Sequence, residues 1–211
     1  MNWTNSIVRK TLYLTGVILV WGSLNQLLAQ DSPFTRLKEK FEAGQIFSGD
    51  FTHQSVDSYT EDTVSSNGWI WVGQERYKVR SEHQSVVVDG ETSMVYDNNR
   101  NRVIISKYEP AEDDFAPSRI LNGIDSTFTV QAEEERDNQF YVRLTSDDPF
   151  AIYKEVEIFL SKQLIPVKIR AVDPVDNIIT TQFSNGKFVA AEQELFLLDY
   201  PEGAEIIDMR N

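Results

Sequence analysis

The feature that most constrains the fold is a long series of short apolar-rich segments separated by turn signals, which begins soon after Gly44. Residues 86–88 are all valine and run into Asp89-Gly90, a dipeptide typical of tight β-hairpins. Such spacing predicts one antiparallel sheet that is curved or closed into a barrel. The expected strands cover residues 51–56, 68–72, 77–80, 86–88, 92–96, 103–108, 126–132, 140–145, 156–161, 164–172, 177–183, 187–189 and 195–198.

Several of these segments are apolar on both faces. Residues 69–72, 86–88 and 103–105 show little alternation, whereas an antiparallel strand with one face in water alternates clearly. Two arrangements satisfy this pattern. Helices can fill the concave side of the sheet with nothing bound, or the sheet can enclose a lipid beneath helical lids. The strand pattern by itself leaves both arrangements open.

Two segments predict helices that could cover such a sheet. Ser32 and Pro33 suit the N-cap and the first helical position, and Gly44 suits the end of the helix. The apolar side chains between them recur every three or four residues as one stripe, at Phe34, Leu37 and Phe41. After an acidic loop at residues 109–114, a second short helix is expected at residues 115–123.

The N-terminus has the three parts of a secretory signal. Arg9 and Lys10 are followed by an uncharged apolar run at residues 12–21 and by the small residue Ala29. The alternative is a permanent membrane anchor, but the apolar run is shorter than the roughly 20 residues that span a bilayer. We therefore expect a cleaved signal peptide at residues 1–29 and one domain at residues 30–211.

Charge and cysteine content exclude several classes of function. The formal net charge is −13, and loss of Arg9 and Lys10 with the signal peptide leaves −15. Such a surface repels nucleic acid and anionic lipid headgroups, so no nucleic-acid partner is expected. The chain has no cysteine, which excludes disulfides, thiol catalysis and thiolate metal sites.

No catalytic or metal-binding constellation is recognisable. His53 and His83 lie in polar, strand-like surroundings without partners at metal-ligand spacing, and are interpreted as exposed strand residues. Asp113 and Asp114 are interpreted as solvated loop residues, and the run of glutamates at 133–135 as a charged hairpin tip. An enzyme acting on lipid or sugar would need convergent polar groups, so we expect no enzyme, no cofactor and no metal.

Seven short motifs follow one another along the mature chain. They are the first helix and residues 47–54 (FSGDFTHQ), 68–72 (GWIWV), 88–97 (VDGETSMVYD), 117–121 (PSRIL), 183–185 (FSN) and 195–204 (LF, then PEGA). In this order, behind a signal peptide, they resemble the LolA family of periplasmic carriers of outer-membrane lipoproteins. The resemblance covers nearly all of the mature chain.

The resemblance implies a mainly β fold with lid helices (α+β), an unclosed antiparallel β-barrel covered by short α-helices. It implies a periplasmic monomer that binds acylated lipoproteins, with an inner-membrane ABC-type release complex as donor and an outer-membrane acceptor. Acyl chains bury well in a dry pocket, because each methylene contributes about 0.8 kcal/mol. By position, the cavity would be lined by Leu37, Phe41, Phe47, Phe51, Tyr77, Val79, Met94, Tyr96, Ile120 and Leu121.

One position departs from the family pattern. Much of the family has an arginine that ties the barrel to the central helix, and this chain has Gln74 there, with two donors and no charge. The hypothesis is a looser lid latch, or one rebuilt with Arg76 or Arg119.

The alternative function is a periplasmic lipid-sensing regulatory domain similar to RseB, which has the same barrel and a further C-terminal domain. The chain ends soon after residues 201–204, which favours the carrier.

Overall fold

The computed structural model describes residues 32–110, 113, 120–121 and 127–210. The expected signal peptide at residues 1–29 lies outside this part of the chain, and so does most of the expected helix at residues 115–123, Arg119 included. No helix within the described part is long and apolar enough to cross a membrane.

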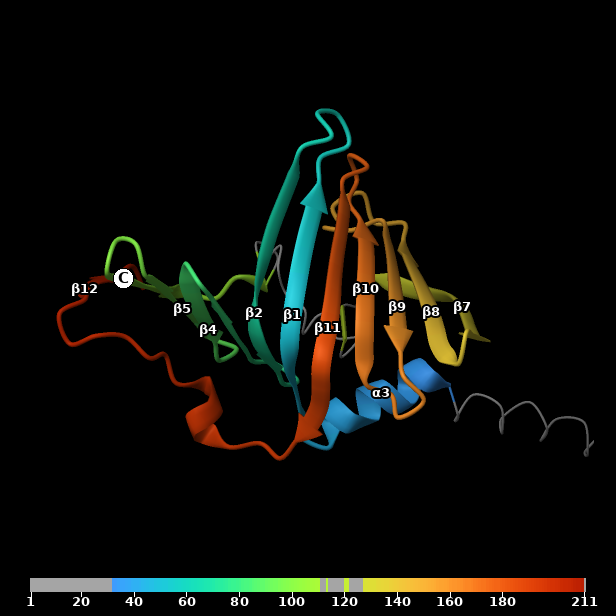
Figure 1. The fold of residues 1–211 in the computed structure, drawn as a ribbon, viewed down its shortest axis with the longest axis horizontal. Helices are drawn as coiled ribbons and strands as arrows, with labels where there is room; N and C mark the ends of the chain where they lie inside the picture. Colours follow the sequence, from blue (N-terminus) through green and yellow to red (C-terminus); the bar gives the residue numbers. More distant parts are fainter. Residues whose placement is uncertain (1–31, 111–112, 114–119, 122–126, 211) are drawn as a thin grey trace, which may run out of the picture.

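Within the described ranges, twelve strands form a single sheet (Figure 1). The strand order is β12-β6-β5-β4-β3-β2-β1-β11-β10-β9-β8-β7, so β12 and β7 are edges and the sheet is not closed. Neighbouring strands are antiparallel except β12 and β6, which are parallel. This confirms the predicted mainly β, unclosed fold. The strands are β1 (Ile46–Val56), β2 (Thr63–Val72), β3 (Tyr77–Ser81), β4 (Gln84–Val88), β5 (Thr92–Asp97), β6 (Arg102–Lys107), β7 (Phe128–Arg136), β8 (Gln139–Ser146), β9 (Glu155–Leu160), β10 (Pro166–Val172), β11 (Ile178–Val189) and β12 (Glu205–Asp208).

The helix α3 (Pro33–Glu42) confirms the first helical prediction. The Ser32 hydroxyl accepts a hydrogen bond from the backbone N–H of Thr35 at 3.1 Å, which satisfies one of the free donors of the first turn. Gly44 follows the helix at φ +77°, a left-handed conformation that costs glycine little. The buried stripe is the predicted one, made of Phe34, Leu37 and Phe41.

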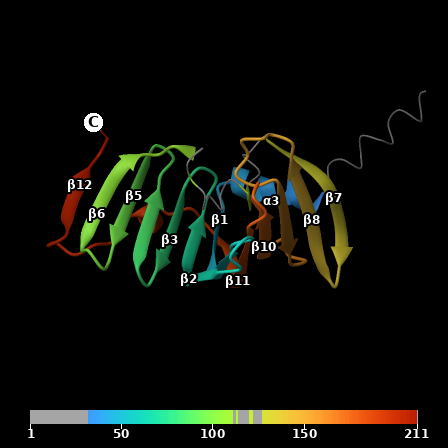
Figure 2. The same ribbon diagram turned by 90° about the horizontal axis from the view of Figure 1, so that it is seen from above.

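The sheet bends into a trough, and α3 lies within the half of it that β7 to β11 form (Figure 2). At the C-terminal end of the helix, the rings of Phe41 and Phe188 meet edge to face at 5.5 Å, and Phe188 lies 5.9 Å from Phe47. These contacts tie α3 to the central strands β1 and β11. Such aromatic pairs add to the free energy of burial through their ring electrostatics.

The other end of α3 is held by Glu133 on the edge strand β7. The Ser32 hydroxyl donates to Glu133 Oε1 at 2.7 Å, and the backbone N–H of Phe34 lies 3.4 Å from Oε2. A carboxylate at a helix N-terminus is stabilised by the unpaired N–H groups and by the helix dipole. The prediction of a hairpin tip at residues 133–135 is therefore wrong. The turn is at Asp137 and Asn138, whose φ angles of 48° and 63° suit short polar residues.

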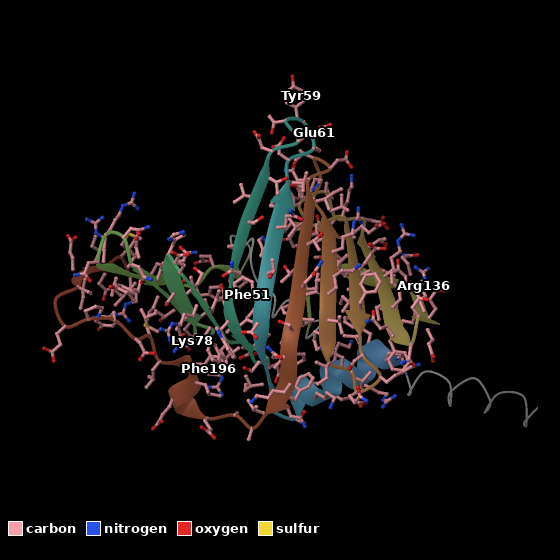
Figure 3. All side chains as sticks on the ribbon, viewed as in Figure 1. Phe51, Tyr59, Glu61, Lys78, Arg136 and Phe196 are labelled. Atoms are coloured by element: carbon pink, nitrogen blue, oxygen red, sulfur yellow. The ribbon has the colours of Figure 1, made fainter. Side chains whose placement is uncertain are left out.

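A second apolar cluster covers the convex face of the sheet, with Ile46, Val87 and Phe196 buried at its centre. Phe196 belongs to a 3-10 helix, η2 (Gln193–Phe196), so the strand expected at residues 195–198 is wrong. The C-terminal segment is also held by Lys78, whose ammonium donates to the carbonyl of Leu197 at 2.6 Å; Figure 3 shows Lys78 and Phe196 beside each other. The segment then adds β12 to the sheet, a strand that the sequence did not predict.

The two clusters explain why the valines at 86–88 show no alternation. Val86 and Val88 pack with the core of the trough, whereas Val87 lies under the C-terminal segment and is fully buried. Both faces of β4 are therefore covered by apolar side chains of this chain.

Gly68 permits a close approach of strands that no other residue would allow. It lies in β2 opposite Phe51 of β1 and Ser81 of β3. A Cβ atom at this position would come within 1.9 Å of the carbonyl oxygen of Arg80, a backbone atom that cannot move independently of β3. The glycine that opens the GWIWV motif is thus required by packing against the neighbouring strand.

We predict that Gly68→Ala lowers the free energy of unfolding by about 2 to 3 kcal/mol, because the new methyl group overpacks against backbone. Urea denaturation followed by circular dichroism measures the change. Gly203→Ala is the matched control, since nothing lies within 4 Å of the Cβ it would add, and its effect should stay within about 0.5 kcal/mol. Equal effects of the two substitutions would contradict this account of Gly68.

Candidate functional site

A cavity of about 380 Å³ lies on the concave face of the sheet, over β1 to β6. Its volume is within the roughly 300 to 1,000 Å³ that is common for small-molecule sites. Phe51 borders it from the central strand β1 (Figure 3). The lining residues are Phe51, His53, Ser66, Tyr77, Val79, Ser81, Gln84, Val86, Ser93, Val95, Ser106, Lys107, Tyr108, Glu109 and Asp113.

A band of valines crosses the floor of this cavity. Val79 of β3 is the register partner of Val86 of β4, which in turn is the partner of Val95 of β5. Residues paired across an antiparallel ladder point to the same face, so the three side chains form one continuous apolar strip. The strip runs across the strands and offers an extended hydrocarbon chain a surface to lie on.

Tyr77 and Asp113 form the polar contact at one end of the cavity. The Tyr77 hydroxyl donates a hydrogen bond of 2.7 Å to Asp113 Oδ2. Burial, and then the negative charge of Asp113, raise the pKa of the Tyr77 hydroxyl well above its ordinary value. The hydroxyl therefore stays protonated and joins β3 to the segment that follows β6.

His53 lies at the opposite end, where the first cavity meets a second one of about 550 Å³ beneath the β8–β9 loop. Its Nδ1 atom is 2.9 Å from the Thr181 hydroxyl of β11, and burial lowers the pKa of the imidazole. The prediction that His53 is an exposed strand residue is wrong, because it faces inward and is half-buried. His83 is exposed as predicted.

The ten predicted cavity residues separate into three groups. Phe51, Tyr77 and Val79 line the cavity. Five others are buried in the same core, where helical side chains meet the sheet, and do not border the cavity: Leu37, Phe41, Phe47, Ile120 and Leu121.

Met94 and Tyr96 form the third group, and the structure contradicts their placement. Met94 packs into the convex cluster, and the Tyr96 ring lies 6.4 Å from that of Tyr200 in the C-terminal segment. Side chains alternate along β5, and Ser93 and Val95 are the ones that face the cavity. The sequence analysis missed other lining residues, Val86 and Val95 among them. Which side chains face the cavity depends on the strand register, and the sequence alone does not determine that register to within one residue.

The three predicted latch residues are not brought together in the described part of the chain. Gln74 is exposed in the turn between β2 and β3. The Arg76 guanidinium lies 4.5 Å from the centre of the Phe196 ring, so it contacts the C-terminal segment. Arg119 is outside the described residues.

The titratable groups do not suggest a metal centre. Among residues 32–110, 113, 120–121 and 127–210, no three histidine or carboxylate side chains lie together as a metal site would need.

The family model described as "Outer membrane lipoprotein carrier protein LolA" matches residues 43–199. Among solved structures, an uncharacterized conserved protein from Thermus thermophilus is similar over 83% of this chain and 96% of its own, at 10% identity and a TM-score of 0.53. A LolA superfamily protein from Nitrosomonas europaea is similar over 80% and 98%, at 11% identity and a TM-score of 0.41.

The MucA/MucB complex structure from Pseudomonas aeruginosa is similar over 79% of this chain and 60% of that chain, at 15% identity and a TM-score of 0.39. Of these three structures, the Thermus thermophilus protein has a TM-score above 0.5, which indicates a shared overall fold. Comparison with curated proteins found no match.

We predict that Tyr77→Phe lowers the free energy of unfolding by about 1 to 2 kcal/mol at neutral pH, because it removes a hydrogen bond to a carboxylate. Tyr59→Phe is the control, since Tyr59 is 94% exposed. The effect should depend on pH. Above pH 10.0, the ordinary tyrosine pKa, Tyr77 ionises in the unfolded chain but keeps its proton when folded. Stability of the wild type should therefore fall with rising pH more steeply than that of Tyr77→Phe. Parallel slopes in urea denaturation would contradict the contact.

Proposed function

The chain belongs to the family of the outer membrane lipoprotein carrier protein LolA, and on this basis we propose that it carries lipoproteins from the inner to the outer membrane with their acyl chains in the concave cavity. The observation that carries the proposal is the valine strip of β3 to β5 at the floor of an open trough. The family is one of carriers, and accordingly we propose binding and release without a catalysed reaction.

Burial of methylene groups supplies the affinity. At about 0.8 kcal/mol for each methylene, ten buried methylenes contribute about 8 kcal/mol before the cost of ordering the chain. The Val79, Val86 and Val95 side chains provide apolar surface, and the cavity next to His53 offers further room for a second chain. Release then requires a partner or a movement that weakens these contacts. Such a partner acts by binding more tightly to the conformation that holds the acyl chains weakly.

We place the carrier in the periplasm, after removal of residues 1–29 as a signal peptide. The pattern of Arg9, Lys10, the apolar run and Ala29 supports export. The partners would be an inner-membrane ABC-type release complex and an outer-membrane acceptor. The acidic chain would be kept from settling on anionic membranes, so that these partners control where cargo is loaded and released.

The proposed latch keeps Gln74 and Arg119 as its candidates. Arg76 contacts Phe196 of the C-terminal segment, and Arg119 lies outside the described residues, so the latch is put to the test at Gln74, in the turn between β2 and β3. An uncharged side chain there would hold the lid by hydrogen bonds alone, which are weaker than those of a charged donor.

Purification of the exported protein and native mass spectrometry test the proposal. We expect a chain that begins at Gln30 and carries acylated lipoprotein. Val86→Trp should lower the bound fraction at least about tenfold by filling the cavity, a loss of about 1.4 kcal/mol of affinity. Val130→Trp is the control, because Val130 is 44% exposed on β7 and does not line the cavity. Recovery of free lipid or of a signalling protein alone would instead favour the regulatory alternative.

A transfer assay tests the latch. Gln74→Ala should release cargo faster than the wild type, by a factor of about 5 if one hydrogen bond of about 1 kcal/mol holds the lid. Gln54→Ala, at an exposed position of β1, is the control. An unchanged release rate would rule out the Gln74 latch and leave the carrier proposal standing.

A further inference from the structure

The wall of the cavity over β1 to β6 is more polar than bare acyl chains require. Nine of its fifteen residues are polar or charged, so the valine strip is a minority of the lining. These nine are His53, Ser66, Ser81, Gln84, Ser93, Ser106, Lys107, Glu109 and Asp113. Hydrocarbon laid over such groups would remove their water without replacing the hydrogen bonds, which is unfavourable.

The polar groups flank the valine strip on both sides. On one side, Ser93 of β5 and Ser106 of β6 are register partners, so their half-buried hydroxyls lie on the same face of adjacent strands. On the other side, the Ser81 hydroxyl donates to the carbonyl of Gln84 at 3.1 Å. Each side of the strip is thus one end of the cavity and carries hydroxyl groups. An amphiphile can lie with its chain on the valines and its head group at one of these ends.

The end with Ser93 and Ser106 is also the acidic end. Asp113 and Glu109 border it together with a single cation, Lys107. Asp113 accepts the Tyr77 hydroxyl, which places its carboxylate at this end of the cavity. With the strong negative charge of the whole chain added, this end attracts hydrogen-bond donors and repels anions.

We propose that the cavity takes amphiphiles whose head group is neutral or cationic and carries hydrogen-bond donors, such as hydroxyl or ammonium, and rejects those with a carboxylate or phosphate head. The acyl chain lies across Val79, Val86 and Val95, and the head lies between Ser93, Ser106 and Asp113. This rests on the proposed function, and it names the class of cargo headgroup that the same cavity selects.

Four probes with one chain length separate head group from tail: monododecanoylglycerol, dodecylammonium, dodecyltrimethylammonium and dodecanoate. Each displaces an apolar fluorescent probe from the intact mature protein below its micelle concentration. The first two carry donors, the third is a cation without donors, and the fourth is an anion. We expect the glycerol and ammonium probes to bind at least about tenfold more tightly than dodecanoate, the effect of one or two hydrogen bonds. Dodecyltrimethylammonium should bind more weakly than dodecylammonium.

Two variants locate the selectivity. Ser93→Ala with Ser106→Ala should reduce the preference for monododecanoylglycerol over dodecanoate to less than about threefold, because the hydroxyl partners are gone. Ser65→Ala, on an exposed position of β2, should leave the preference unchanged. If the double variant does not fold, each single alanine variant should reduce the preference part of the way.

The outcomes distinguish the two proposals. If the four probes bind with equal affinity in the wild type, the head-group inference is overturned and the carrier function stands. If neither the fluorescent probe nor any of the four binds, the carrier function itself fails. Loss of the preference in Ser65→Ala would also overturn the inference, because the selectivity would then not lie in the cavity.

Discussion

The attachment of α3 across one half of the trough determines the rest of the structure. Phe41 and Phe188 hold its C-terminal end to the centre of the sheet, and Glu133 holds its N-terminus to the edge strand β7. One ten-residue helix spans about 15 Å, which is three strand spacings and far less than a twelve-stranded sheet. The helix therefore covers only part of the sheet, within the half formed by β7 to β11, and the cavity lies over the other half.

The open half needs support from outside because its concave face is hollow. The C-terminal segment provides it, with Phe196 over Val87 and Ile46, and with the Lys78 ammonium on the carbonyl of Leu197. Burial of apolar side chains on the convex face stabilises these strands and offsets the packing energy that is missing on the concave face. The strands β3 to β6 can thus present a valine strip and a row of hydroxyls to a ligand while remaining part of one folded sheet.

The sequence predicts what depends on local periodicity and turn chemistry. The stripe of Phe34, Leu37 and Phe41 gave the helix, and Asp89-Gly90 gave the β4–β5 hairpin, because both signals act within a few residues. Prediction from the sequence fails where contacts between residues far apart in the chain determine the structure. Met94 points outward and Val95 inward because of the register with β4 and β6, and a one-residue change in register would reverse them. The strand expected at residues 195–198 is absent, because residues 193–196 form a 3-10 helix whose Phe196 packs with Val87. The glutamates at 133–135 are in a strand, and one of them caps α3.

The carrier proposal requires that the concave face of the sheet, and not the convex one, binds acyl chains. Adjacent positions on β5 test it most directly, because Val95 faces the cavity and Met94 packs on the convex side. A photo-cross-linking amino acid is placed at each position in turn, and the protein is loaded with a lipoprotein that carries isotope-labelled acyl chains. We predict adducts to the labelled chains from position 95 and none from position 94. Adducts from position 94 alone would contradict the proposal.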